Sequence, residues 1–182
     1  MNKLVGAWIA TTVVLSIVAS VDSHVASALA LVPPKIWHGE LWRLVTWAFV
    51  ERSVSSALIK AYIIYQFAGV LVATWSSRKL TTFVVVIAAL SAIATCVIAL
   101  VLPSVAAVDR LGGWTVTALL LTAVSRQSPE RELVWFGGPF RLKGKHGILL
   151  VAGLTLLLVV LAGPLAMIPE LAACGLAAIF PI

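Results

Sequence analysis

The stretch WHGELWRLVT, residues 37–46, is the most polar and most aromatic segment in the first hundred residues, and it lies between two long apolar runs. Trp37 and Trp42 carry flat amphipathic rings, which suit the headgroup level of a bilayer. Glu40 and Arg43 are three residues apart, so in a helical turn they share a face and can pair. The simplest interpretation is a loop at the membrane interface, anchored by its tryptophans.

The composition of the whole chain is that of a membrane protein. Of its 182 residues, 62% are hydrophobic and 11% are charged, and the mean hydropathy is +1.10. A soluble domain carries about a quarter charged residues. We therefore predict an integral membrane protein with a single domain over residues 1–182. The net charge of +6 lies in loops between apolar runs, which indicates contact with anionic lipid and argues against nucleic acid as a partner.

Six apolar runs predict an all-α bundle of six transmembrane helices. The runs cover residues 4–21, 56–75, 80–102, 111–124, 147–161 and 169–180. The fourth rises only about 21 Å, less than the hydrocarbon core of about 30 Å. Such a helix must be surrounded by other helices, or the bilayer must be thin beside it. The charged segment at residues 125–145 is predicted to be a solvated cytoplasmic loop.

Lysine and arginine are concentrated on the side of the predicted bundle that also carries the N-terminus. The positive-inside rule then predicts a cytoplasmic N-terminus, in the plasma (inner) membrane, with residues 37–46 on the outer side. Lys60 falls inside the second run. An ionisable residue within a span is a functional candidate, although its side chain can equally extend to the near interface.

Three stretches carry a resemblance to a known family. Residues 39–46, GELWRLVT, resemble the G-E-x-W-R-L-x-T signature in the first loop of rhomboid-superfamily membrane proteins. Residues 75–80, WSSRKL, are similar to the family's W-G-S-R-R-F turn after the second helix. Residues 125–129, SRQSP, followed by WFG at 135–137, resemble the Derlins, which are protease-dead rhomboid relatives. The resemblance covers residues 36–160 and implies a six-helix rhomboid-like bundle.

The residues that active rhomboids use for proteolysis are replaced at the matching positions. Ser56 and Lys60 stand where the family has a histidine and an asparagine that stabilise the oxyanion. Thr115 stands in place of the serine nucleophile, and Glu170 in place of the histidine base. The chain's own histidines, at positions 24, 38 and 146, are not placed to activate Thr115. The resemblance therefore implies a pseudoprotease with no catalytic residues.

Inactive relatives of this kind bind transmembrane helices of client proteins and distort the bilayer around them. We expect the same here, with membrane lipids and transmembrane helices as partners. The candidate structural and partner-binding residues are Glu40, Trp42, Arg43, Lys60 and Glu170. Two alternatives stay open: a structural subunit of a larger membrane complex, and a divergent intramembrane protease that uses Thr115.

No cofactor and no metal ion are predicted. Cys96 and Cys174 lie inside apolar segments, and neither has another cysteine or a histidine at ligand spacing. Packing is the expected role of both thiols.

Overall fold

Four helices of the computed structural model are long and apolar enough to cross a membrane. The structure describes residues 3–112, 114–130, 132–134 and 141–179. The four spans are α1 (Lys3–Val21), the continuous helix Val54–Val72, α7 (Ser77–Val101) and α10 (Gly144–Ala162). The predicted helical membrane protein is thereby confirmed.

Two of the six predicted membrane helices are shorter than a span. They are α9 (Thr115–Gln127) and α11 (Ile168–Ile179), which correspond to the fourth and sixth apolar runs. That the chain crosses the bilayer six times therefore stays a prediction. The helix Val54–Val72 is composed of α5 (Val54–Ile63), a π-helical turn η1 (Ile64–Ala68) and α6 (Gly69–Val72).

The connections between the spans are also structured. Residues 22–53 contain the short helices α2 (Ser23–Leu29), α3 (Pro33–Trp37) and α4 (Arg43–Thr46), and α8 (Pro103–Ala106) follows α7. The charged segment predicted as a loop contains an antiparallel pair of three-residue strands, β1 (Glu132–Val134) and β2 (Arg141–Lys143). Within the described residues, the regular secondary structure is thus helical except for these two strands.

Local sequence signals explain where several of these helices begin. Ser53 and Ser76 cap α5 and α7, since each hydroxyl accepts a hydrogen bond from a backbone N–H of the first turn. Asp22 caps α2 in the same way. Pro33 and Pro103 occupy the first turns of α3 and α8, where the missing N–H costs nothing.

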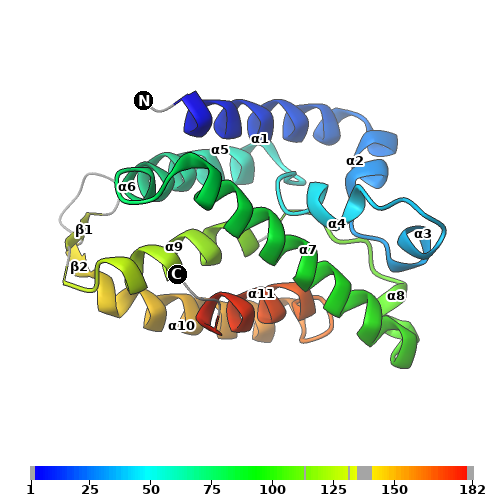
Figure 1. Cartoon of the computed structure of the whole chain (residues 1–182). Helices are drawn as coiled ribbons and strands as arrows, with labels where there is room; N and C mark the ends of the chain where they lie inside the picture. Colours follow the sequence, from blue (N-terminus) through cyan, green and yellow to red (C-terminus); the bar gives the residue numbers. More distant parts are fainter. Residues whose placement is uncertain (1–2, 113, 131, 135–140, 180–182) are drawn as a thin grey trace.

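The centre of the bundle is α9, in which every side chain from Thr115 to Ser125 is buried. It packs against α10, α11, α7 and η1, while α1 packs against α5. Figure 1 shows the N-terminus and the hairpin at one end of the molecule, and α2, α3, α4 and α8 at the other. We call the latter the α4 end, meaning residues 22–53, 102–112 and 114. The surrounding helices shield α9, as its short length requires.

Candidate functional site

The opening stretch folds into a compact clamp on the C-terminus of α2. Arg43 is only 2% exposed, and its Nε donates a hydrogen bond to Glu40 Oε2 at 2.7 Å. One Nη donates to the carbonyls of Ala30, at 2.8 Å, and Ser27. Trp42 Nε1 donates to the Ala28 carbonyl at 3.1 Å. These donors satisfy carbonyl groups that the end of α2 leaves without helical partners.

The predicted Glu40–Arg43 pair is therefore present, and the backbone acceptors around it come from α2. Trp42 is 53% exposed, so its ring lies at the surface of the bundle while its N–H is used. Glu40, Trp42 and Arg43 form one cluster, which we call the α2 clamp.

A second buried arginine holds the α4 end together, and sequence reasoning missed it. Arg110 donates to the carbonyls of Val105 (2.9 Å), Val108 (2.8 Å) and Leu165 (3.0 Å). Its backbone also pairs with that of Leu31. Burial lowers the pKa of its guanidinium, and the charge of the Glu170 carboxylate opposes this effect. In the sequence, only its position beside the start of the fourth apolar run marked it.

Lys60 turns into the bundle and forms an ion pair with Glu51. The two side chains are 3% and 10% exposed. The Lys60 ammonium also donates to the Ala48 carbonyl at 2.9 Å, and the Glu51 backbone N–H donates to Ser16 Oγ of α1 at 2.9 Å. In this conformation the Lys60 side chain does not extend to the near interface, which was the alternative.

Gly112 allows the Glu51 carboxylate to occupy its place. Its φ is +62°, and a Cβ atom there would collide with the Val50 carbonyl and the Glu51 carboxylate. The Gly112 N–H donates to the Trp47 carbonyl at 2.6 Å, which holds the two segments together. A glycine at this position is required both by the backbone angle and by the space.

Glu170 belongs to the same charged region, although it comes from α11. It is 6% exposed and interacts electrostatically with Arg110, Lys60 and Glu51. Its Oε2 has no hydrogen-bond partner within the described part of the chain. The structure thus brings together two of the predicted site residues, Lys60 and Glu170, with Glu51 and Arg110. The α2 clamp is a separate cluster.

Thr115, which the resemblance to rhomboids assigns to the nucleophile position, has no neighbouring base among the described residues. Thr115 is completely buried, and its hydroxyl has no partner among the residues that the structure describes. The three histidines are exposed: His24, His38 and His146. An imidazole that activates the Thr115 hydroxyl is therefore missing from the described surroundings of this residue.

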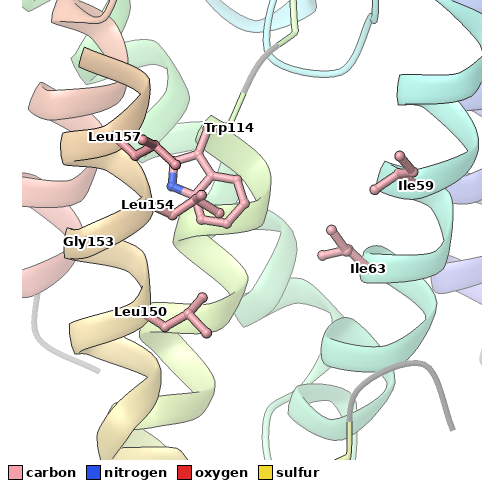
Figure 2. Close-up of a pocket in the computed structure, with 7 residues that line it drawn as sticks. All are labelled: Ile59, Ile63, Trp114, Leu150, Gly153, Leu154 and Leu157. Carbon is pink, nitrogen blue, oxygen red and sulfur yellow. The ribbon is translucent and has the colours of Figure 1, made fainter. Parts of the chain in front are cut away.

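Two adjoining cavities open between α5 and α10. The larger has a volume of about 580 Å³, and Figure 2 shows its lining, Ile59, Ile63, Trp114, Leu150, Gly153, Leu154 and Leu157. In this view Ile59 and Ile63 project from α5 toward α10, and Trp114 lies between the two helices. The Trp114 indole is fixed by a hydrogen bond from Nε1 to Thr155 Oγ1 of α10, at 3.0 Å.

The second cavity gives this space a polar end. Its volume is about 410 Å³, and it shares Ile59, Ile63, Trp114 and Leu154 with the first. Its polar lining residues are Glu51, Ser56, Lys60 and Thr117. We call the two cavities together the α5–α10 groove. Sequence reasoning singled out Lys60 and Ser56, but it gave no sign of the facing wall, because the residues with which α10 lines the groove are all apolar.

Comparison with known proteins yields one match. A family model described as "Eukaryotic integral membrane protein (DUF1751)" matches residues 4–178. Searches of curated proteins and of solved structures gave no significant match.

Proposed function

Because the chain belongs to this family of eukaryotic integral membrane proteins (DUF1751), we propose that it works inside the bilayer as a rhomboid-like protein without protease activity. In this proposal, the α5–α10 groove holds a transmembrane helix of a client protein. The observation that carries the proposal is the groove itself, a largely apolar space between two membrane-spanning helices. The stretches at residues 39–46 and 75–80, which resemble rhomboid motifs, support the rhomboid-like part of the proposal.

In this proposal the groove opens to the lipid, so a helix can enter it sideways. Ile59 and Leu157, on opposite walls, are 54% and 50% exposed. Among its helical neighbours, α10 packs chiefly against α9, which leaves its groove face uncovered. A client that is already in the bilayer therefore reaches the groove without leaving the hydrocarbon.

The chemistry of the walls suits a helix. Helices associate in membranes through close packing, small residues and interhelical hydrogen bonds. Gly153 on α10 has open space where a side chain would stand, so a partner's backbone can approach there. Lys60 and Thr117 add polar groups to one end of an otherwise apolar surface. Both features favour a packed helix over disordered lipid chains.

The experiment is photo-crosslinking in membranes. A photoreactive residue is placed at Leu154, inside the groove, and for comparison at Leu149, which is 69% exposed and lies outside the groove lining. A single-span apolar helix of about 20 residues is co-expressed as the probe. We expect the probe to be labelled from Leu154 and not from Leu149. Labelling of lipid alone from Leu154, or equal labelling of the helix from both positions, contradicts the proposal.

The alternative function is that of a structural subunit of a larger complex, and copurification and exchange of the probe helix distinguish it from client binding. A subunit would copurify from native membranes as one stoichiometric complex, with the groove filled by a fixed neighbour. A client-binding protein would exchange the probe helix for unlabelled helix. Exchange on dilution with unlabelled helix therefore favours client binding, and resistance to exchange favours the subunit.

A further inference from the structure

The polar end of the groove has a composition that determines which helices it accepts. Glu51, Ser56, Lys60 and Thr117 line one end, whereas the other end is lined by apolar side chains such as Leu150. We propose that the Glu51–Lys60 pair binds a side-chain amide, of Asn or Gln, on the client helix through hydrogen bonds. This inference rests on the proposed function, because it assumes that a helix occupies the groove.

The hydrogen-bonding capacity of the pair favours an amide. A lysine ammonium has three N–H donors, and within the described residues Lys60 has two partners, the Ala48 carbonyl and Glu51. A carboxylate accepts several hydrogen bonds through its two oxygens. An amide offers an acceptor to Lys60 and donors to Glu51 in one planar group. The pair thus complements an amide better than it complements an apolar side chain.

Charge balance argues against a charged client residue. Lys60 and Glu51 already neutralise each other. A charged client residue would lose its hydration in the groove, and it would find no unpaired opposite charge there to offset this cost. A neutral hydrogen-bonding group avoids this cost.

The depth of the pair fixes where the amide must lie. Lys60 is six residues from the start of the span Val54–Val72, a rise of about 9 Å. The client's amide should therefore lie about 9 Å, or six residues, from the end of its apolar segment that is at the α4 end. An amide near the opposite end would face Leu150 and find no partner in the groove lining.

The test uses three co-expressed single-span helices and the photoreactive residue at Leu154. One helix is entirely apolar, one has Asn six residues from its α4-end terminus, and one has Asn six residues from its other terminus. Basic flanks fix the topology of each helix. We expect the second helix to be labelled about three- to tenfold more than the other two, which corresponds to a membrane hydrogen bond.

The variant Glu51→Gln/Lys60→Met provides the second measurement. In this variant the labelling of the second helix should fall to that of the apolar helix. Equal labelling of all three helices by the unaltered protein overturns this inference and leaves the proposed function intact. Absence of labelling for every helix overturns the proposed function. Because the comparison of helices uses the unaltered protein, it decides the question even where the variant does not fold.

Discussion

Lys60 on α5 and Glu51, nine residues earlier in the chain, form an ion pair inside the bundle, with side chains 3% and 10% exposed. The pair joins two elements, because Glu51 is also tied to α1 through Ser16. Removing one partner of a buried ion pair leaves an uncompensated charge, which is costlier than losing both. The first prediction follows from this ion pair.

Lys60→Met should lower the free energy of unfolding by about 3–5 kcal/mol. The variant Glu51→Gln/Lys60→Met should lose clearly less than the sum of the two single changes, since no charge is left unpaired. Thermal unfolding in detergent measures both. The control is Lys145→Met, which breaks an exposed pair with Glu130 and should change the melting temperature little. Additive losses from Lys60 and Glu51 would show that the pair is energetically unimportant.

Arg43→Ala should also destabilise the protein, through the α2 clamp. The guanidinium makes charge-assisted hydrogen bonds to Glu40 and to two carbonyls of α2, each worth about 1.5–3 kcal/mol when shielded. Arg43→Lys should recover only part of the loss, because an ammonium lacks the planar fork. The exposed Arg78→Ala serves as the control. Complete recovery with lysine would reduce the role of Arg43 to that of a positive charge at the interface.

The sequence predicts the helices better than it predicts the site. Uniform apolar runs fixed five helix starts to within about three residues, since burial in lipid leaves the backbone no alternative to a helix. The fourth begins at Thr115 and not at residue 111, because Gly112 has a positive φ that a right-handed helix does not allow.

Partners that lie far apart in the sequence could not be predicted. Glu40 and Arg43 are three residues apart, so local spacing gave their pairing. Glu170 reaches Lys60 and Arg110 only through the packing of α11. The hairpin was missed because its strands have three residues each, too few for an alternating pattern to stand out.

Gly112→Ala tests the close approach of the two loops at the α4 end. A methyl group there would collide with the Glu51 carboxylate and strain the backbone, so we expect a lower melting temperature and a disturbed Glu51–Lys60 pair. The matched control is Gly175→Ala in α11, where nothing lies within 4 Å of the added atom. That change should be neutral, or stabilising by up to about 1 kcal/mol, because alanine favours a helix. Equal effects of the two changes would contradict the described packing.

Thr115 provides the prediction on catalysis. Its buried hydroxyl has no partner within the described residues, so Thr115→Val should leave the free energy of unfolding unchanged or raise it by about 1 kcal/mol. The unaltered protein, incubated in bilayers with a helix-destabilised transmembrane substrate, should not cleave it. Cleavage that is lost in Thr115→Val would instead identify a threonine protease.

The short helix α11 leads to the last prediction, a thinned bilayer beside it. Its twelve residues rise about 18 Å, against a hydrocarbon core of about 30 Å. Near its end, Arg126 donates a hydrogen bond to the Ala177 carbonyl at 3.0 Å, which places a guanidinium at that level. A guanidinium at this level favours lipid headgroups beside it, because a charge surrounded by hydrocarbon carries a high cost.

Spin labels measure this difference in depth. A label at Ile179, which is 82% exposed at the end of α11, should be reached by a polar relaxation agent. A label at Leu90, near the middle of α7, should be reached chiefly by oxygen. Replacing Arg126 with leucine should shift the Ile179 label toward hydrocarbon, because the headgroups lose their anchor. A label at Ile179 that reports a hydrocarbon environment in the unaltered protein, with no response to Arg126→Leu, would mean that the bilayer keeps its full thickness beside α11.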